Sequence, residues 1–559
     1  MSGQGPLIFW TSNPALPGNT ILVHGAGLDQ ATNVSVRRVT DGPPGTPGSP
    51  VLPPPSGAAT CPPLQPSPAS VKFVLPDTLK RGLFALSVET PEARTNVAYL
   101  NRPCVWWCQG DAGLDASPGG RIRLFGTCLG WGGRPKTTVV LKGAQAFTLT
   151  SSAQPYSAQV DLPQDLPADQ YEVFVHNGYG GRLGWSQPLN IIVAAPEPWP
   201  AIVFNVRDFG AKADGTDDTD AIAKALQQAQ QNAGGVVYFP RGSYKVTATL
   251  SVPPKTVLRG ERMDLAHLYW TNPWNQRLPA VILGTNHFGL EDLTLTFTGA
   301  DNGILADVPR QGIVTAPALR QVGDEASGIF LRRVRVRWLL YSGHMEIADA
   351  NQIQTATTRD SAYGARGFLL AFGGKNIDIC DCDLYSSGNV FNLVDAKGAR
   401  IAHNSLSIGR CGWANFDGCD SVICEDNRFV GADNMVRQGV TFWSTLPMQN
   451  VYFAGNKLDH VYFHDREGMT TDGASGKYFG SVASSTGNSV TLPTVLKPDD
   501  LQDHLCFVLA GTGQGQWRSV VGNTPRRSQW IVLGTCYPDP IRSSESTIRS
   551  RASSSSGTP

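Results

Sequence analysis

The sequence predicts an all-β protein, and three observations support this class. Charged residues make up only 16% of the 559 residues, whereas the chain contains 60 Gly and 40 Pro, a balance typical of turn-rich β structure. A pattern of strand and turn is repeated near the start of the chain, and short strands recur later at intervals of about 20 to 30 residues. We therefore expect two β-sandwiches followed by a stack of short coils.

The overall charge excludes some classes of partner. The 46 basic and 46 acidic residues cancel, so no net charge favours nucleic acid or an anionic membrane, and no nucleic-acid partner is expected. No run of apolar residues approaches the eighteen that a membrane span needs, so no membrane insertion is expected. The start, MSGQGPLIFW, lacks the basic region and apolar core of a secretory signal.

The 11 Cys leave the redox compartment open, and Cys104 or Cys108 could pair with Cys128 in an oxidising setting.

Two sequence pairs reveal an internal repeat in the first part of the chain. PGNTILVHGAGL (17–28) and PGGRIRLFGTCL (118–129) share a turn, alternating apolar residues and a Gly before a Leu. LPDTLKRGLFALSV (75–88) and LPQDLPADQYEVFV (162–175) each place an LP turn before an alternating strand. The offset of 101 residues at the first pair falls to 87 at the second, which an insertion of 14 residues in the first copy would explain. The Pro-rich segment 43–68 is that insertion, and we expect an extended surface loop.

The repeat predicts two β-sandwich domains, 1–101 and 102–195, which resemble immunoglobulin-like domains of the IPT/TIG type. Three Trp of these domains are either sugar-stacking platforms or parts of the core and of the interface with the next domain. These are Trp106, Trp107 and Trp185. The stretch AAPEPWPAI (194–202) then reads as a stiff linker, after which the composition changes.

The segment DFGAKADGTDDTDAI (208–222) predicts a turn followed by a helix over about 217–233. Thr216, Asp217 or Asp218 can cap the helix, and the apolar residues that follow recur at intervals of three and four. Acidic side chains in a first helical turn stabilise it by about 0.3 to 1 kcal/mol each, which explains most of the clustering of carboxylates.

A longer stretch carries a resemblance to a known family. FNVRDFGAKADGTDDTDAI, GGVVYFPRGSYKV and LRGE together closely resemble the N-terminal segment of the pectate lyase superfamily domain. Polygalacturonase-like glycosidases, some polysaccharide lyases and phage tailspikes share this domain. The resemblance implies a right-handed parallel β-helix over 196–480, a helix that covers its first coil, and carbohydrate as the substrate class. It also implies that the acidic cluster is architectural, not catalytic.

Coil repeats can be aligned in the later sequence. IDICDCDLY, ARIAHNSLSI, VICEDNRFVG and VYFAGNKLDH align when Cys382, Asn404, Asn427 and Asn456 coincide, at steps of 22, 23 and 29 residues. Each of these four residues is followed two positions later by an apolar residue. Those residues are Leu384, Leu406, Phe429 and Leu458. Because stacked buried Asn side chains can satisfy backbone groups at a turn, we expect a structural ladder.

The cysteines of this region do not predict a metal site. Structural zinc sites usually contain C-x2-C pairs, whereas Cys380 and Cys382 form C-x-C. We expect these two residues on one face of a strand, packed in the interior of the coils, and no metal ligands.

Glycoside cleavage needs two carboxyl groups about 5 to 10 Å apart. YFHDREGMTTDG (462–473) supplies the densest set, because Asp465 and Glu467 lie two residues apart and Asp472 follows in a turn. The alternative is a solvated loop in which these carboxylates pair with Arg466 or Arg437.

A second candidate is GRCGWANFDGCD (409–420), in which Asp417 can project into the same groove and Trp413 can stack on a sugar. Packing and turn formation are the alternative roles of these residues. The long step between coils contains a loop at about 436–449 that could wall the groove. The catalytic candidates are thus Asp465, Glu467, Asp472 and Asp417. The candidates for substrate binding are Arg466, His464, Arg437, Trp413, Arg410 and Trp443.

The motifs of the best-known relatives do not stand in this chain as a set, so the resemblance transfers no catalytic residue. We expect a glycoside hydrolase that acts on a polysaccharide or oligosaccharide. The alternatives are a polysaccharide lyase, in which Arg437, His464 and Arg466 would matter most, and a non-catalytic adhesin. No cofactor is expected, with Ca²⁺ an alternative for a lyase. The chain is expected to be a monomer or a homotrimer, secreted or at the cell surface.

The C-terminal part is expected to form β-hairpins over 481–545, and the Ser-rich end, 546–559, a disordered tail.

Overall fold

The structure is a computed structural model, whose chain forms two compact units: Met1–Ala195 together with Gly476–Pro559, and Pro196–Ser475. The residues that it describes are 5–48, 59–133, 135–273, 276, 278–284, 286–306, 327–339, 368–409, 413–431, 439–441, 448–460, 469–470, 478–486, 489–493, 501, 505–510, 517–523, 529–533 and 547–549.

The first sandwich consists of two antiparallel sheets with strand orders β1-β2-β6-β5 and β4-β3-β7-β8. Alternate side chains of both sheets meet in one core, which contains Val23, Val34, Phe73 and Phe84. The strands are β1 (Leu7–Thr11), β2 (Thr20–Ala26), β3 (Asn33–Arg38), β4 (Ala59–Cys61), β5 (Leu64–Ser67), β6 (Ser70–Val74), β7 (Phe84–Glu89) and β8 (Ala98–Leu100).

The second sandwich repeats this arrangement, with strand orders β9-β10-β13 and β12-β11-β14-β15. The strands are β9 (Cys104–Gly110), β10 (Arg121–Thr127), β11 (Thr137–Lys142), β12 (Ala146–Ser151), β13 (Ser157–Asp161), β14 (Asp169–His176) and β15 (Leu189–Val193). The motifs 17–28 and 118–129 form the equivalent strands β2 and β10, each central in its sheet. The internal repeat is therefore confirmed in the fold, whereas the immunoglobulin type and the domain bounds stay predictions.

The Pro-rich insertion differs from the expected surface loop. Its last part forms β4 and β5, each at the edge of a sheet of the first sandwich. Pro lacks the backbone N–H that pairs with a neighbouring strand. It is tolerated on an edge strand because no strand lies on the outer side to accept that hydrogen bond. Composition thus excluded a central strand correctly but wrongly suggested that the segment forms no strand.

The two sandwiches are joined by buried amide groups. Asn101, which is fully buried, donates from Nδ2 to the carbonyl oxygens of Ala15 and Gly82 at 2.8 and 2.9 Å. Asn177 Nδ2 donates to the carbonyl oxygens of Asn101 and Cys128 at 2.9 and 2.8 Å. Of these four bonds, the one from Asn177 to Asn101 runs between the sandwiches, and the other three lie within one sandwich.

The predicted Trp platforms are mostly internal. Trp185 is buried and donates from Nε1 to the carbonyl oxygen of Pro44 at 2.7 Å. Trp107 is also buried and stacks on Phe125, with ring centroids 4.1 Å apart. Trp106 alone of the three is exposed, at 58%. The alternative of core and interface packing therefore holds for Trp107 and Trp185.

Two thiols considered for a disulfide in this unit are unpaired, with Cys128 buried and Cys108 half-buried. Cys128 carries a free thiol, and so does Cys108. Burial raises the pKa of each thiol to about 12, so both stay protonated near neutral pH.

A buried histidine, His176, lies at the same junction. The Nδ1 atom of His176 accepts a hydrogen bond from the Gly178 amide at 3.0 Å, so Nε2 carries the proton and donates to the Gly181 carbonyl at 2.7 Å. Burial lowers the pKa of His176 below its ordinary value of 6.5. Below pH 6.5 the unfolded chain therefore binds a proton that the folded sandwich resists.

We expect the unfolding free energy of the sandwiches to fall as the pH drops below 6.5, by at most about 1.4 kcal/mol per pH unit for this one group. The loss ends where the pH reaches the lowered folded pKa of His176. Denaturant titration of wild type and His176→Gln across pH 5 to 8 measures it, and the variant should lose this part of the pH dependence. An equal acid loss in both proteins would contradict the role of His176.

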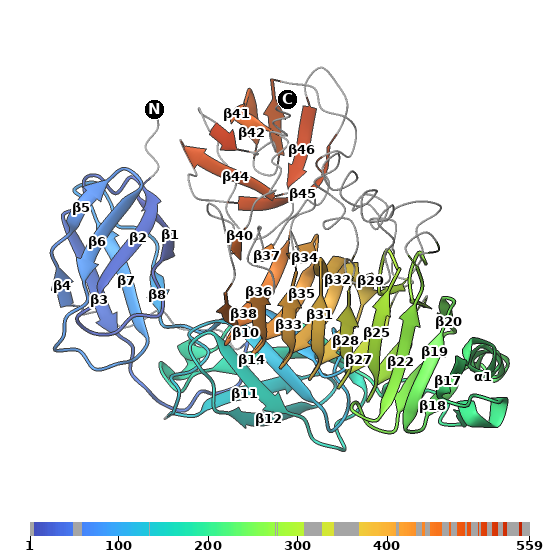
Figure 1. Cartoon of the computed structure of the whole chain (residues 1–559). Helices are drawn as coiled ribbons and strands as arrows, with labels where there is room; N and C mark the ends of the chain where they lie inside the picture. The colour runs from blue at the N-terminus through green and yellow to red at the C-terminus, as the bar shows by residue number, and fades with distance from the viewer. Residues whose placement is uncertain are drawn as a thin grey trace. The chain divides into compact units, whose positions relative to one another are not determined.

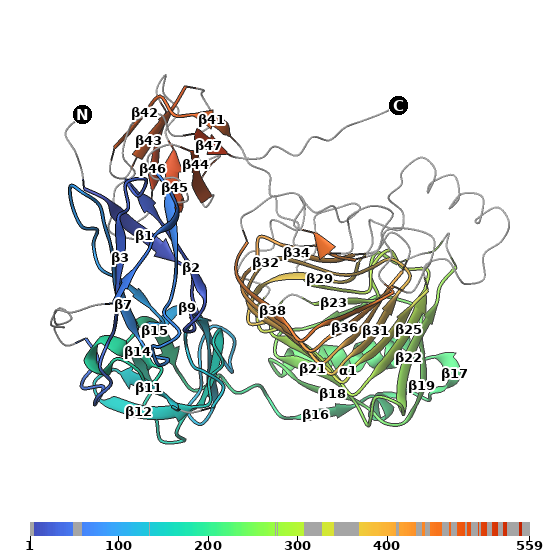
Figure 2. The ribbon, with the colours of Figure 1, turned by 90° about the vertical axis from the view of Figure 1, so that its left-hand side faces the viewer.

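The second unit is a parallel β-helix, as predicted, built from three sheets that surround one apolar interior (Figures 1 and 2). We call them the first, second and third sheets, in the order in which each coil visits them. The first sheet contains β16 (Val203–Asn205), β18 (Gly235–Phe239), β21 (Thr256–Gly260), β24 (Phe288–Glu291), β27 (Phe330–Arg332), β30 (Asp378–Cys380), the end of β32 (Asn389–Ala402), β35 (Asp420–Glu425) and β38 (Gln449–Ala454).

The second and third sheets are stacked in the same way. The second contains β17 (Asp214–Asp217), β19 (Gly242–Val246), β22 (Ala266–Thr271), β25 (Thr294–Thr298), β28 (Arg335–Trp338), β31 (Asp383–Ser386), β33 (Ser405–Ile408), β36 (Arg428–Gly431) and β39 (Lys457–Asp459). The third contains β20 (Leu250–Val252), β23 (Ile282–Gly284), β26 (Ile304–Ala306), β29 (Phe368–Lys375), the start of β32, β34 (Trp413–Asp417), β37 (Gly439–Thr441) and β40 (Met469–Thr470). All neighbouring strands in these sheets pair in parallel. Their pairings follow the order of the coils.

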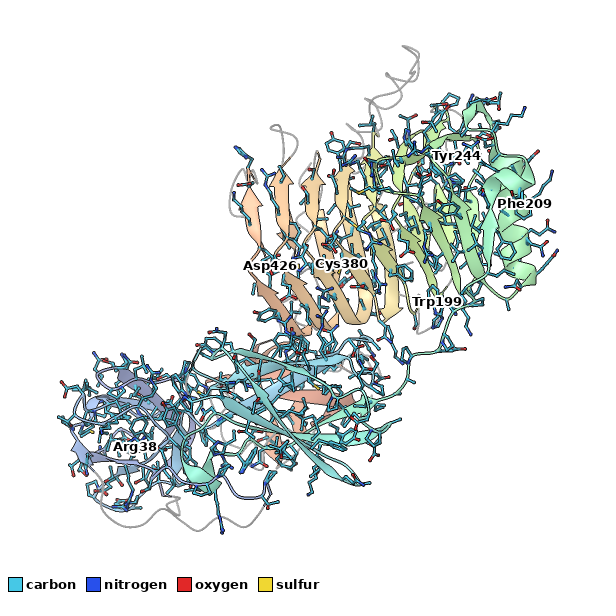
Figure 3. The ribbon with its side chains drawn as sticks, turned by 90° about the horizontal axis from the view of Figure 1, so that it is seen from below. Arg38, Trp199, Phe209, Tyr244, Cys380 and Asp426 are labelled. Carbon is cyan, nitrogen blue, oxygen red and sulfur yellow. The ribbon has the colours of Figure 1, made fainter. Side chains whose placement is uncertain are left out.

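The corner between the first and second sheets contains the predicted Asn ladder (Figure 3, near Cys380 and Asp426). The Asn427 side chain accepts from the Asn404 amide at 3.0 Å, and its Nδ2 donates to the Ile401 carbonyl at 2.9 Å. Asn456 accepts from the Asn427 amide at 2.9 Å, and Asn404 accepts from the Cys382 amide at 2.9 Å. The expected pairs Leu384↔Leu406, Leu406↔Phe429 and Phe429↔Leu458 are also in register. The ladder is confirmed as structural.

The helix α1 (Thr219–Gln231) packs its apolar face on the first coil, at one end of the stack (Figure 1). Asp218 occupies the N-cap position, but its carboxylate accepts from the amides of Lys212 and Ala213 at 2.7 and 3.1 Å instead of from the helix. Asp217 accepts from the Thr219 amide at 3.0 Å. The acidic cluster therefore fixes the cap of the β-helix, as the resemblance implied.

The end of the linker is fastened to the β-helix. Trp199 lies against Phe330, with ring centroids 5.4 Å apart, and against His287 at 6.3 Å (Figure 3). Glu197 forms an ion pair with Lys255. These contacts give a physical reason for the predicted stiffness, since an aromatic side chain and an ion pair hold this part of the linker.

The C-terminal residues form an antiparallel sheet of order β41-β47-β44-β45-β46-β43-β42. Its strands are β41 (Phe479–Ser481), β42 (Ser484–Thr486), β43 (Ser489–Leu492), β44 (Leu505–Ala510), β45 (Trp517–Asn523), β46 (Gln529–Leu533) and β47 (Thr547–Arg549). The prediction of a disordered tail from 546 is wrong at β47, which pairs with β41 and β44. Its Thr and Ile suit a strand despite the Ser-rich surroundings.

Candidate functional site

Most residues chosen from the sequence lie outside the described part of the chain. These are Asp465, Glu467, Asp472, Arg466, His464, Arg437, Arg410 and Trp443. Of the remaining two, Trp413 begins β34, and its backbone pairs with Gly439 of β37. Asp417 ends the same strand and is buried, at 6% exposed. The structure therefore places one of the four catalytic candidates, on the third sheet.

The outer side of the third sheet carries a row of polar residues. On β34, Ala414 and Phe416 belong to the apolar core, so the alternation of the strand puts Asn415 and Asp417 on the outer side. On β32, Phe391 and Leu393 belong to the core, and Asn392 lies between them on the outer side. Asn392 and Asn415 are register partners on neighbouring strands.

The residues of this row change from mainly apolar to polar types along the stack of coils. In the early coils its register positions are Ser251, Leu283, Leu305 and Ala371. In the later coils they are Asn392, Asn415, Thr441 and Thr470. The change from mainly apolar to polar residues occurs after β29. In sequence, Asp465 and Glu467 precede β40 and Asp472 follows it, so the predicted carboxylates adjoin the last strand of the same sheet.

Two carboxyl groups stand where the third sheet turns toward the first. Asp417 ends β34, and its register partner Val394 precedes Asp395, which adopts a left-handed conformation with φ 50°. Burial raises the pKa of the neighbouring Cys419 thiol to about 12, and the charges of both Asp417 and Asp395 add to that rise. Asp395 therefore lies one residue beyond the register partner of Asp417, so the two acidic residues stand on adjacent coils at the same corner.

Asp395 and the two amides are not among the candidates chosen from the sequence. A weak signal was present: when NLVD (392–395) and NFDG (415–418) are aligned on their Asn residues, an apolar residue follows each Asn, and the Asp residues are offset by one position. That alignment requires the strands of the third sheet to be identified first. Asn404 and Asn427 were easier to find because clear strands flank them on both sides.

The charged residues on the outer side of the first sheet pair with one another. Arg332 and Arg400 contact Asp378 at 2.9 and 3.5 Å, and Arg400 also contacts Glu425 at 4.0 Å. Arg259 forms an ion pair with Glu291. Since these charges are matched and partly exposed, we assign them a structural role.

The expectation for the C-x-C pair was partly wrong. Cys382 belongs to the apolar core, as expected. Cys380 is also buried, but it contacts Asp378 and Arg400, each at 2.9 Å from its sulfur, on the outer side of β30. The left-handed residue Asp381, with φ 56°, separates the two, so they do not share one face of a strand. Within the described ranges, no three His, Cys, Asp or Glu residues are grouped to hold a metal ion.

No helix in the described part of the chain is long and apolar enough to span a membrane.

Comparison with known proteins confirms the resemblance over part of the chain. Residues 203–277, which contain α1 and strands of the first two coils, match a family described as rhamnogalacturonase A/epimerase, pectate lyase-like. The chain is 35% identical to alginate lyase 7 of Azotobacter vinelandii over 105 residues, 16% of this chain and 12% of that protein. It is 27% identical to a mannuronan C5-epimerase of the same organism over 225 residues, 37% of this chain and 12% of that protein.

The chain thus spans about 12% of the length of both relatives. Among solved structures, a Family 28 exopolygalacturonase of Yersinia enterocolitica aligns with 64% of this chain and 69% of its own, at a TM-score of 0.31 and 15% identity.

Proposed function

We propose that this chain is an enzyme that cleaves glycosidic bonds of a polysaccharide or oligosaccharide by hydrolysis, at the outer side of the third sheet. The observation that carries the proposal is the pair of carboxyl groups, Asp395 and Asp417, on adjacent coils beside the buried amides Asn392 and Asn415. The similarity to proteins named for polysaccharide chemistry supports the choice of substrate class.

Hydrolysis needs one carboxyl group to protonate the leaving oxygen and a second to activate water or attack the sugar. Asp417 and Asp395 can fill these two roles from a rigid scaffold, because each lies at the end of a strand segment whose alternate residues are fixed in the core. Asp465, Glu467 and Asp472 adjoin β40 in sequence and stay candidates for the same chemistry.

A second candidate is a lyase or an epimerase, which the similarity to an alginate lyase and a mannuronan C5-epimerase favours. Here a base removes the proton beside a uronate carboxylate, and the carbanion either expels the leaving group or is reprotonated. Arg437, His464 and Arg466 are then the residues of interest, and Ca²⁺ is the cofactor to test. A non-catalytic adhesin is the remaining alternative.

The test is to incubate the full chain with neutral glucans, polygalacturonate and mannuronan. Reducing ends, ultraviolet absorbance from unsaturated uronyl products and inversion at C5 by proton NMR are then followed. We expect new reducing ends without absorbance. Reducing ends with absorbance would replace hydrolysis by elimination, and inversion without cleavage would replace it by epimerisation. Binding without any reaction would contradict an enzymatic role.

A further inference from the structure

Two buried amide groups on the third sheet each leave one polar atom without a partner. Asn392 Nδ2 and Asn415 Oδ1 make no hydrogen bond to any residue that the structure describes. Both side chains are more than nine-tenths buried, at 3% and 6% exposed. They are register partners on β32 and β34, so their Cα atoms lie about 4.8 Å apart.

The Asn ladder shows that stacked, buried Asn side chains in this β-helix can have all their polar atoms hydrogen-bonded. Asn404 and Asn427 are stacked on the same coils and are equally buried, at 2% each. There, Asn404 Nδ2 donates to Asn427 Oδ1 at 2.9 Å, and Asn427 Nδ2 donates to Asn456 Oδ1 at 2.9 Å. The ladder satisfies its amides internally, whereas the pair on the third sheet does not.

An unmatched buried donor or acceptor destabilises the folded chain by about 1 to 3 kcal/mol. The pair offers one N–H donor and one oxygen acceptor next to each other, and both lie on the outer side of the sheet. A hydroxyl group fits both, because its oxygen accepts from Asn392 Nδ2 while its proton is donated to Asn415 Oδ1. A carboxylate can only accept, so it would leave Asn415 Oδ1 unmatched and bring its negative charge against the negative end of that amide dipole.

We propose that Asn392 and Asn415 form a subsite for a single sugar hydroxyl, which selects a hydroxyl over a carboxylate at that position of the substrate. The inference rests on the proposed function, because it places the sugar on the same outer side as Asp417 and Asp395. The burial of the pair means that it receives one hydroxyl group and not the face of a sugar ring.

The test uses an oligosaccharide that the wild-type chain processes, and measures its dissociation constant by calorimetry. Asn392→Leu and Asn415→Leu each remove one half of the pair at similar volume. We expect each to weaken binding by about 10- to 100-fold. A series of monodeoxy oligosaccharides, each lacking one hydroxyl group, should contain one member that the wild type binds as weakly as the Leu variants bind the parent sugar. The Leu variants should bind that member as well as they bind the parent sugar. Ser251→Leu, at the same row in the first coil, is the matched control and should bind as the wild type does.

Thermal melting separates this role from a structural one. Each Leu variant should melt at or above the wild-type temperature, since an unmatched polar atom has been removed. Wild-type affinity in both Leu variants would overturn the subsite and would indicate a structural water between the amides, while the proposed function would stand. Absence of any polysaccharide binding by the wild type would overturn both proposals together.

Discussion

Replacement of Asp417 by Asn is expected to lower the rate of polysaccharide cleavage by about 10²- to 10⁴-fold, the range over which a positioned general acid or base contributes. Asn keeps the size of the side chain and its ability to accept a hydrogen bond, but it cannot transfer a proton. Asp417 lies at the end of β34 on the outer side of the sheet, so the substitution should leave the apolar core unchanged. Initial rates at saturating substrate measure the loss.

Asp420→Asn is the matched control, because Asp420 lies three residues further on and starts β35, where it accepts from Asn450 Nδ2 at 2.8 Å. That variant should keep its activity within about twofold, a change below 0.5 kcal/mol. Asp465→Asn and Glu467→Gln are tested alongside. If Asp417→Asn keeps full activity and either Asp465→Asn or Glu467→Gln loses activity, Asp417 is not the catalytic residue.

Replacement of Asn427 by Leu is expected to destabilise the β-helix by about 3 to 5 kcal/mol. The change removes the Nδ2 donor from the Ile401 carbonyl and from Asn456 Oδ1. It also removes the acceptor of the Asn404 amide and of Asn404 Nδ2. Because these groups are buried between coils, water cannot readily replace the lost partner. The midpoint of denaturant unfolding, followed by circular dichroism, measures the loss.

Asn450→Gly provides the comparison. Asn450 is partly buried, makes one hydrogen bond to Asp420, and has a φ of 56° that Gly adopts without strain. Its loss should be about 1 kcal/mol. Equal midpoints for Asn427→Leu and the wild type would show that the ladder does not stabilise the fold.

The sequence allowed the ladder to be predicted because its signal is local. Each ladder residue lies between two short strands, and the apolar residue two positions later fixes the register, as in Asn404 with Leu406 and Asn427 with Phe429. The cap could be predicted for the same reason, although the carboxylate of Asp218 turned out to bind Lys212 and Ala213 and not the helix.

The third sheet could not be predicted in this way. Its strands are separated from the rest of their coils by segments of unequal length, such as the one between β28 and β29, so no constant step reveals the register. Asn392 and Asn415 become partners only through pairing of β32 with β34. Sequence reasoning therefore favoured the dense carboxylates at 462–473 and did not select Asp395.

Composition also misled for three strands. The Pro-rich insertion and the Ser-rich end both contain a few β-compatible residues, which form β4 and β5 at sheet edges and β47 between β41 and β44. Pairing with a distant strand decided these elements, and local propensity did not.

The central claim is that polysaccharide binds at the outer side of the third sheet, beside Asp417. Hydrogen exchange followed by mass spectrometry tests it most directly, on full-length Asp417→Asn with and without an oligosaccharide that the wild type cleaves. We expect slower exchange in peptides that contain Asn389–Val394 and Trp413–Asp417, and no change in the two sandwiches. Slower exchange confined to the sandwiches, with none in the third sheet, would contradict it.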